Sequence, residues 1–187
     1  MPAFTIKPTL TGELVELRPV RAEDAPGLHT ASAETLRLTG TRKHFSLDEL
    51  EHWYATRADH DDRLDLSIIE RADGTWAGEA VLMDLDTHNL SCSFRIYLGQ
   101  VSSYGRGLGT EATRLMLAHA FDTVGLHRVS LEVLDFNPRA RHVYEKVGFV
   151  HEGTQRDALR WDGQWIDAHT MAILAPGWAA HRGYPAA

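Results

Sequence analysis

A glycine-rich segment at positions 104–110, with the sequence YGRGLGT, carries the clearest chemical signal in the chain. It follows a stretch typical of a strand and precedes one typical of a helix. Glycines at alternating positions let the backbone curl, so that several N–H groups point into one hollow at the positive end of a helix dipole. Such a hollow binds a pyrophosphate.

Two well-known glycine loops do not fit this spacing. A dinucleotide-binding G-x-G-x-x-G loop that begins at Gly105 needs a third glycine where Thr110 stands, and a P-loop needs a lysine that is absent. A plain turn is the remaining alternative, because glycines between a strand and a helix often serve only to turn the chain. The surrounding elements and motifs must decide between a turn and a binding loop.

The elements around this loop alternate as in a single α/β (α+β) domain. Helices are expected to begin at a capping box of Ser46 and Glu49 and at the cap Asn137 before Pro138, and the tail from Pro176 is expected to be loosely held. The order β-α-α-β-β-β-α-β-α-β-β places the glycine loop before the third helix. The predicted strands are 14–20, 64–70, 76–83, 91–98, 128–134, 149–158 and 165–174, and the predicted helices are 22–33, 46–57, 108–124 and 137–148.

Bulk properties restrict the classes of function. The 187 residues are expected to form one domain, 1–187, with an ordered core over about 10–175. The net charge of −7 and the lack of a Lys/Arg stripe argue against nucleic acid, and no apolar run is long enough to cross a membrane. Cys92 is the only cysteine, which excludes an internal disulfide. We therefore expect a cytoplasmic protein with no nucleic-acid or membrane partner.

Four motifs in a fixed order resemble one family. They are Phe94-Arg95-Ile96, the segment 105–112, Asn137-Pro138-Arg139-Ala140 and Tyr144-Glu145-Lys146-Val147-Gly148-Phe149. Together they resemble the GNAT N-acetyltransferases, in particular the branch of ribosomal-protein and spermidine acetyltransferases. The likeness spans roughly 14–174 by element order and is specific from 94 to 153. It implies the GNAT fold, a mixed and largely antiparallel twisted sheet of about seven strands with four helices. It also implies transfer of an acetyl or related acyl group from acetyl-CoA to a primary amine.

The resemblance implies three groups of acetyl-CoA contacts. Loop N–H groups hold the pyrophosphate, with added charge from Arg106. The end of the strand at 91–98 splays from its neighbour and pairs with the pantetheine arm. Asn137 reaches the same arm, although capping a helix explains it equally well. Tyr104 departs from the Gln or Arg usual there, which weakens a side-chain contact but spares the backbone cradle. The implied contacts are Tyr97, Leu98, Gly99, Tyr104, Gly105, Arg106, Gly107, Gly109, Thr110, Asn137 and Ala140.

Acylating an amine with a thioester requires a neutral nucleophile, a stabilised oxyanion and a proton for the departing thiolate. The resemblance assigns that proton to Tyr144, whose alternative role is a packed helix tyrosine. Backbone N–H groups near Leu98 and Gly99 are the expected oxyanion donors. Glu79 is the first choice of base, because a carboxylate beside the thioester strand can be desolvated, which raises its pKa; a solvent-facing glutamate is the alternative. Other candidate bases are Glu132, Asp84, His119 and His142.

The acceptor is less readable than the cosubstrate. It is a protein N-terminus, a polyamine, an aminoglycoside or a small metabolite. Aspartates after the second helix steer a cation or simply form a solvated loop with the arginines between them. Three tryptophans line the acceptor pocket or belong to the core. The histidines lack metal-ligand spacing, so no metal is expected, and a homodimer is the family-level expectation. The aspartates named above are Asp59, Asp61, Asp62 and Asp65, and the tryptophans are Trp53, Trp161 and Trp165.

Two other functions remain as alternatives. A non-catalytic acyl-CoA sensor or scaffold would keep the cradle without turnover, and the presence of Tyr144 counts against it. A nicotinamide or flavin enzyme is disfavoured by Thr110 and by the antiparallel strands before the loop.

Overall fold

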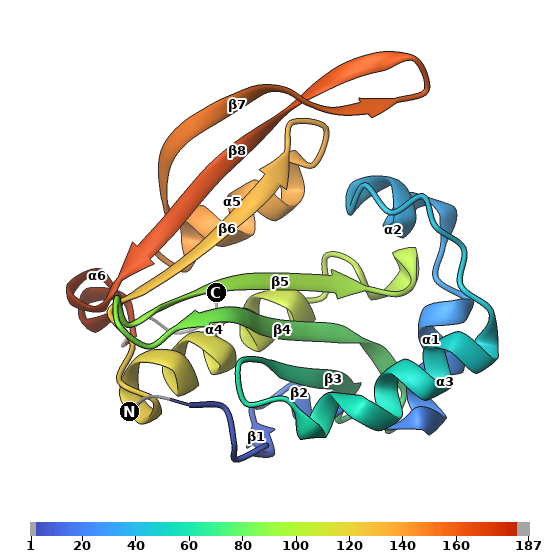
Figure 1. Ribbon diagram of the computed structural model, residues 1–187, viewed down its shortest axis with the longest axis horizontal. Helices are drawn as coiled ribbons and strands as arrows, with labels where there is room; N and C mark the ends of the chain where they lie inside the picture. The colour runs from blue at the N-terminus through green and yellow to red at the C-terminus, as the bar shows by residue number, and fades with distance from the viewer. Residues whose placement is uncertain (1–2, 183–187) are drawn as a thin grey trace.

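One eight-stranded sheet forms the centre of the molecule (Figure 1). The structure is a computed structural model, and it describes residues 3–182. The strand order is β1-β2-β3-β4-β5-β6-β8-β7, and each neighbouring pair is antiparallel except β5 and β6. The strands are β1 (Leu10–Thr11), β2 (Val15–Pro19), β3 (Leu64–Glu70), β4 (Trp76–Asp86), β5 (Ser91–Leu98), β6 (Arg128–Leu134), β7 (Val150–Trp161) and β8 (Gln164–Leu174).

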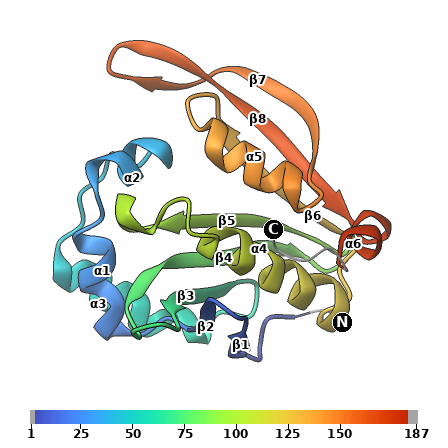
Figure 2. The ribbon, with the colours of Figure 1, turned by 180° about the vertical axis from the view of Figure 1, so that it is seen from behind.

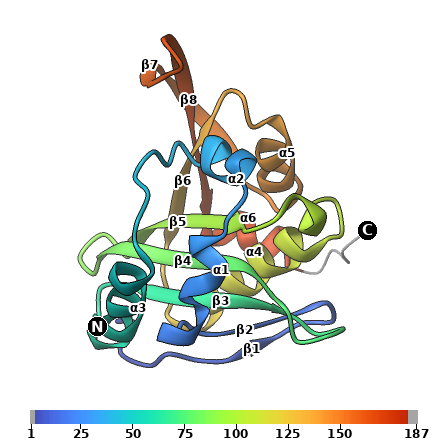
Figure 3. The ribbon, with the colours of Figure 1, turned by 90° about the vertical axis from the view of Figure 1, so that its right-hand side faces the viewer.

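Helices cover both faces of this sheet (Figures 2 and 3). The helices α4 and α5 lie on one face, which we call the rear face, and α3 lies on the opposite, front face. The short helix α1 lies next to α3, at one end of the strands. In residues 3–182, no helix is long and apolar enough to cross a membrane. The α-helices of this part of the chain are α1 (Ala25–His29), α2 (Ala33–Leu38), α3 (Leu47–Thr56), α4 (Leu108–Ala118), α5 (Pro138–Lys146) and α6 (Ala175–His181).

The sheet splits at its one parallel pair of strands. The ladder between β5 and β6 joins only residues 91–93 to 128–130. Beyond this point the two strands open into a V (Figure 1), because β5 continues along β4 whereas β6 continues along β8. Backbone groups that face the opening therefore have no partner in a neighbouring strand.

The rear face carries the main hydrophobic core. Alternate strand residues such as Leu66 and Ala80 point toward Ala112 and Met116 of α4, and all four are fully buried. This agrees with the two-residue period of a strand and the four-residue spacing of a helix face. A smaller cluster lies beneath α1 and α3 on the front face, and it consists of Val20, Ala25, Leu50 and Tyr54.

Local signals in the sequence placed many elements correctly. The strands predicted at 64–70, 91–98 and 128–134 have those bounds in the structure. Ser46 Oγ accepts a hydrogen bond from the Glu49 N–H at 3.2 Å, and the Glu49 carboxylate accepts one from the Ser46 N–H at 2.8 Å. Asn137 Oδ1 accepts a hydrogen bond from the Ala140 N–H at 3.1 Å. The predicted starts of α3 and α5 are therefore confirmed.

Three predicted segments differ in kind from the structure, and β4 and β7 continue three residues beyond their predicted ends at 83 and 158. The helix predicted at 22–33 is divided into a 3-10 turn, α1 and α2, because Ser32 Oγ caps a new helix and the Ser32 N–H donates to the Gly99 carbonyl at 2.9 Å. The helix predicted at 108–124 changes to a π-helical turn after Ala118. The tail from Pro176 forms α6, and Trp178 in it is 5% exposed, so the expectation of a loosely held tail is wrong as far as His181. The unpredicted strand β1 gives the sheet eight strands where seven were predicted. The divided helix and α6 give six α-helices in the described residues where four were predicted.

Gly78 on β4 is expected to tolerate no side chain. A Cβ there would lie 2.1 Å from the Tyr97 carbonyl oxygen and 2.9 Å from Leu98 Cα, which both belong to neighbouring backbone. Gly78→Ala should lower the free energy of unfolding by about 3 kcal/mol, because a rotamer change cannot relieve this overlap. Urea unfolding followed by tryptophan fluorescence measures the loss. Gly153→Ala is the control, since a Cβ there meets no atom within 4 Å. Equal losses in both variants would contradict the steric explanation.

Candidate active site

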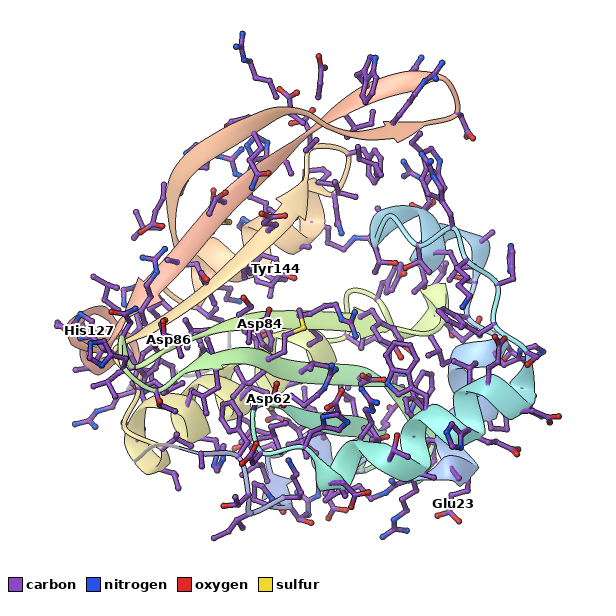
Figure 4. The ribbon with its side chains drawn as sticks, in the orientation of Figure 1. Glu23, Asp62, Asp84, Asp86, His127 and Tyr144 are labelled. Carbon is purple, nitrogen blue, oxygen red and sulfur yellow. The ribbon has the colours of Figure 1, made fainter. Side chains whose placement is uncertain are left out.

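A cleft of about 1120 Å³ occupies the opening between β5 and β6. Figure 4 shows Tyr144 of α5 in this opening and Asp84 on β4 beside it. Tyr144 lines the cleft on the rear side. Arg95 and Glu132 also line it, and both lie on the front face, because each alternates along its strand with residues of the rear core. The cleft therefore passes through the sheet from its rear face to its front face.

The loop predicted to bind a pyrophosphate lines the rear side of the cleft. Gly105 and Gly107 have φ of +72° and +83°, which lie in the left-handed region that favours glycine. Leu108 begins α4, so the N–H groups of this first turn have no partner within the helix. A Cβ on Gly105 would meet no atom within 4 Å. The loop thus surrounds open space at the positive end of α4, and this arrangement fits a pyrophosphate.

Two side chains of the loop make contacts that we did not predict. Arg106 forms a two-pronged ion pair with Glu70 at the end of β3, which offsets the charge expected to face the phosphates. The Tyr104 hydroxyl lies 2.7 Å from Thr35 Oγ1, and the Arg139 guanidinium lies 4.7 Å from the centroid of the Tyr104 ring. Tyr104 therefore joins the loop to α2 and α5 in place of the Gln or Arg usual in the family.

Glu111 in the first turn of α4 holds the turn between β1 and β2. Its carboxylate accepts hydrogen bonds from the N–H groups of Glu13, Leu14 and Val15 at 2.8, 2.7 and 2.8 Å. Leu14 lines the cleft next to Gly107. The only sequence signal for this anchor was an acidic residue near a helix N-terminus, which does not reveal a distant partner.

The edge of β5 offers fewer free amides than we predicted. The Gly99 N–H donates to the Ala77 carbonyl at 2.9 Å, and the Gly99 carbonyl accepts from the Ser32 N–H at 2.9 Å. The prediction that the Gly99 N–H polarises a thioester is therefore wrong. Hydrogen-bonded pairs alternate along an antiparallel ladder, so the amides of Leu98 and Ile96 point away from β4 and toward the opening.

Tyr144 presents a hydroxyl to the cleft. The residue is 7% exposed, and its ring packs edge-on against Phe94 and Phe149 with centroid distances of 6.5 and 5.7 Å. Burial raises the pKa of the Tyr144 phenol, and no hydrogen bond joins its hydroxyl to another residue in the described part of the chain. Tyr144 is therefore a neutral O–H donor without a protein partner, as a general acid requires.

Glu79, the predicted base, lies on the front face of β4 and is not among the residues that line the cleft. It is 3% exposed, and its Oε2 accepts hydrogen bonds from the hydroxyls of Tyr54 at 2.6 Å and Tyr97 at 2.9 Å. Burial raises the pKa of the Glu79 carboxyl, against the lowering effect of both hydrogen bonds and of Arg95. Desolvation was predicted from the sequence, but the two phenols were not.

The other candidate bases divide into two groups. Asp84 and Glu132 line the cleft, and the Gln155 amide donates a hydrogen bond to Glu132. Asp84 has φ of +56° at an irregularity of the β4–β5 ladder, and its side chain is exposed. His119 is buried, which lowers its pKa, and neither His119 nor His142 lines the cleft.

The aspartates after α3 and the three tryptophans do not line the cleft. Asp65 forms a two-pronged ion pair with Arg63 at 2.6 and 2.7 Å, and the other three aspartates are exposed. Trp53 packs edge-on against an aromatic ring near α3, Trp161 lines a separate smaller cavity, and Trp165 is 60% exposed. Within residues 3–182, no group of three or more His, Cys, Asp or Glu side chains is placed to hold a metal ion.

Known proteins resemble this chain along most of its length. Residues 15–150 match the acetyltransferase (GNAT) domain family. The spermidine N(1)-acetyltransferase of Vibrio cholerae is 30% identical over 129 residues, which are 69% of this chain and 73% of that protein. The spermidine N(1)-acetyltransferase of Escherichia coli is 28% identical over 173 residues, which are 91% of each chain. A crystal structure of the Vibrio cholerae spermidine N-acetyltransferase with CoA and spermine has a TM-score of 0.82 at 23% identity, over 90% of this chain and 99% of that one.

Proposed function

Because the chain belongs to the GNAT acetyltransferase family and is an acetyl-CoA-dependent N-acetyltransferase, we propose that its cleft binds acetyl-CoA from the rear face and the amine from the front. One observation carries this proposal: a single cavity joins the backbone cradle before α4 to the Glu132 carboxylate on the front side, and Asp84 also lines it. Converging N–H groups favour a pyrophosphate, whereas carboxylates favour an ammonium group. The two substrates then meet where β5 and β6 diverge.

The residues on the rear side fit the CoA part of the cosubstrate. The N–H groups of 105–110 hold the pyrophosphate, and Asn137 and Ala140 of α5 line the adjoining part of the cleft. The amides of Leu98 and Ile96 face the opening, where they pair with the pantetheine arm and the thioester carbonyl. Acetyl-CoA supplies the acetyl group as an activated thioester. A preorganised N–H donor at the developing oxyanion is worth about a hundredfold to a thousandfold in rate.

Two side chains carry the proton transfers of this proposal. Tyr144 gives its proton to the departing CoA sulfur, since its buried hydroxyl opens to the cleft without a protein partner. Glu79 holds the proton that the amine loses, because a carboxylate with a raised pKa accepts a proton more readily than an exposed one.

The acidic residues that line the cleft favour an acceptor that carries a second positive charge besides its reacting amine. Neither Asp84 nor Glu132 forms an ion pair with another residue among 3–182, although both line the cleft. Of the described residues, four cations line the cleft: Arg95, Arg106, Arg139 and Lys146. Arg95, on the front side, lies 3.9 Å from the Glu79 carboxylate, and Arg106, on the rear side, is paired with Glu70, which offsets their charges. Two relatives are named for spermidine, which carries more than one ammonium group. Diamines and polyamines are therefore the acceptor class that we propose.

Thiol release from acetyl-CoA across a panel of amines tests this function. We expect release that depends on the amine and that is faster with spermidine than with butylamine, because butylamine has one charge and a similar reacting group. Alanine-starting peptides and aminoglycosides complete the panel. Equal rates with spermidine and butylamine would contradict a role for the second charge. No release with any amine, together with calorimetric binding of CoA, would favour the non-catalytic sensor.

We also propose that the chain acts as one domain, as a homodimer and in the cytoplasm. The homodimer is what the family resemblance implies. Cys92 is the one cysteine of the sequence, so the chain has no internal disulfide, which fits a reducing compartment.

A further inference from the structure

Three side chains form a hydrogen-bonded cluster on the front face of the sheet, beneath α3. The hydroxyls of Tyr54 and Tyr97 donate to the same oxygen of Glu79, at 2.6 and 2.9 Å, and lie 3.2 Å from each other. Tyr54 and Glu79 are each 3% exposed. The carboxylate is therefore separated from bulk water by the two phenols and by the helix above them.

Only one member of this cluster reaches the cleft. Tyr97 lines the cleft, whereas Tyr54 and Glu79 do not. Arg95 also lines the cleft and lies 3.9 Å from Glu79 Oε1, but a guanidinium has no site that accepts a proton at neutral pH. A phenol both accepts and donates a hydrogen bond. Tyr97 is thus the side chain through which a proton can pass between the cleft and Glu79.

The charges around the cluster favour proton uptake by Glu79. Burial is the largest cause that raises the pKa of its carboxyl, and Asp65 raises it further, while Tyr54, Arg95 and Tyr97 lower it. Asp65 lies on the neighbouring strand β3 and is paired with Arg63. Two further charged groups near the cluster are Arg57 after α3 and Asp24 before α1, which is paired with Arg18. The acidic residues of α3 itself, Asp48, Glu49 and Glu51, are exposed.

We propose that Tyr97 relays a proton from the ammonium group of the acceptor to Glu79, an inference that rests on the amine acetylation proposed above. The Tyr97 oxygen accepts a proton from the nitrogen while the Tyr97 hydroxyl proton moves to Glu79 Oε2. The neutral nitrogen then forms the C–N bond, and the C–S bond breaks as Tyr144 protonates the sulfur. The nitrogen, now bonded to the acetyl carbon, loses a second proton to the Tyr144 phenolate, which restores the Tyr144 hydroxyl. Glu79 later releases its proton to water. One proton is therefore released for each amide formed from an ammonium.

A buried carboxylate is a costly way to fill this space. Taking a carboxylate out of water costs several kcal/mol unless its partners compensate, and an apolar side chain of similar size is often at least as stabilising. The two phenols satisfy Oε2, whereas the nearest cation to Oε1 remains 3.9 Å away. A purely structural role would therefore gain little from Glu79, but a proton acceptor needs its ionisable group.

Two tyrosine variants separate the relay from a structural role. Tyr97→Phe removes the hydroxyl of the residue that lines the cleft, and Tyr54→Phe removes a hydroxyl that donates to the same oxygen from a residue that does not line it. With spermidine at pH 7, we expect Tyr97→Phe to lower kcat/KM by about a hundredfold, as for loss of general base catalysis. In the pH profile of kcat/KM, Tyr54→Phe should reach the wild-type plateau at high pH. The acid limb of this profile should move to higher pH, because losing a donor to the ionised carboxylate raises the Glu79 pKa.

Glu79→Gln completes the test. We expect a loss similar to that of Tyr97→Phe, no further loss in the double variant, and disappearance of the acid limb that reports Glu79. A rate for Tyr97→Phe within about threefold of wild type, or losses that multiply in the double variant, would overturn the relay. Circular dichroism and CoA binding by calorimetry show that each variant is folded.

The relay and the proposed function fail in different ways. If wild-type protein releases no thiol with any amine of the panel, the proposed function fails and the relay fails with it. If wild-type protein acetylates spermidine and Tyr97→Phe does so equally well with the same pH profile, only the relay is wrong. Equal shifts of the acid limb and equal losses of kcat/KM in Tyr54→Phe and Tyr97→Phe would also overturn the relay, since they would show that both phenols merely support the carboxylate.

Discussion

Tyr144→Phe is expected to lower kcat for acetyl transfer by about a hundredfold to ten-thousandfold, the usual contribution of a positioned general acid. KM for acetyl-CoA should change little, because the substitution removes an interaction that matters in the transition state and leaves the cradle at 105–110 intact. The ring that remains can keep its contacts with Phe94 and Phe149. A loss of activity in this variant therefore reports chemistry and not packing.

The leaving group gives this prediction a matched control. An acetyl thioester whose thiol is more acidic than CoA leaves without help from an acid, so the difference between wild type and Tyr144→Phe should shrink with it. Unfolding stability should stay the same or rise, because the lost hydroxyl is buried and has no protein partner in the described residues. Full activity with acetyl-CoA, or an equal loss with both thioesters, would remove Tyr144 from the role of acid.

The elements that the sequence predicted well are those with local causes. The capping box at Ser46 and the cap at Asn137 depend on residues three positions apart, so the chain specifies them before it folds. The strands 64–70 and 91–98 are rich in apolar and β-branched residues between turn signals. The glycine loop was readable for the same reason, since its backbone shape depends on Gly105 and Gly107 themselves.

The parts of the site that were missed depend on partners far away in the chain. Nothing near Glu111 indicates that its carboxylate holds the backbone of Leu14, and nothing near Arg106 indicates Glu70. The Gly99 amide was misassigned because its ladder partner, Ala77, follows from the register between β4 and β5. Such contacts are fixed by tertiary packing and not by local propensity.

The cluster of Glu79, Tyr54 and Tyr97 was predicted only in part from the sequence. The strand pattern placed Glu79 in a strand, and the family resemblance made the neighbouring strand the thioester strand; together they were enough to predict a desolvated carboxylate with a raised pKa. Because Tyr54 comes from α3, its position over Glu79 required the packing of that helix on the sheet. The sequence therefore identified the carboxylate but not the Tyr97 phenol that we propose as its link to the cleft.

Asp24→Ala is expected to lower the free energy of unfolding by about 3 to 5 kcal/mol, because it breaks a buried ion pair and leaves a charge without its partner. Asp24 is 5% exposed, and its carboxylate accepts hydrogen bonds from Arg18 Nη1 and Nη2 at 2.8 and 2.7 Å. It also accepts them from Ser67 Oγ at 2.7 Å and from the Arg21 N–H at 3.0 Å. These bonds fasten the segment before α1 to β2 and β3, on the face where we place the acceptor.

The same variant should change how stability depends on pH. Burial alone would raise the pKa of Asp24, but the hydrogen bonds from Arg18, Ser67 and Arg21 outweigh it, and the pKa is lowered. A group with a lowered folded pKa stabilises the protein above its unfolded pKa, about 4 for Asp, and this contribution is lost as pH falls through the folded value. Urea unfolding at pH 7 and at about pH 3 should therefore show a smaller acid-induced loss in Asp24→Ala than in wild type. Glu34→Ala is the control, since its ion pair with Arg37 is exposed and contributes little to stability. If both variants lose the same small amount at pH 7, the Asp24 network does not hold this face together.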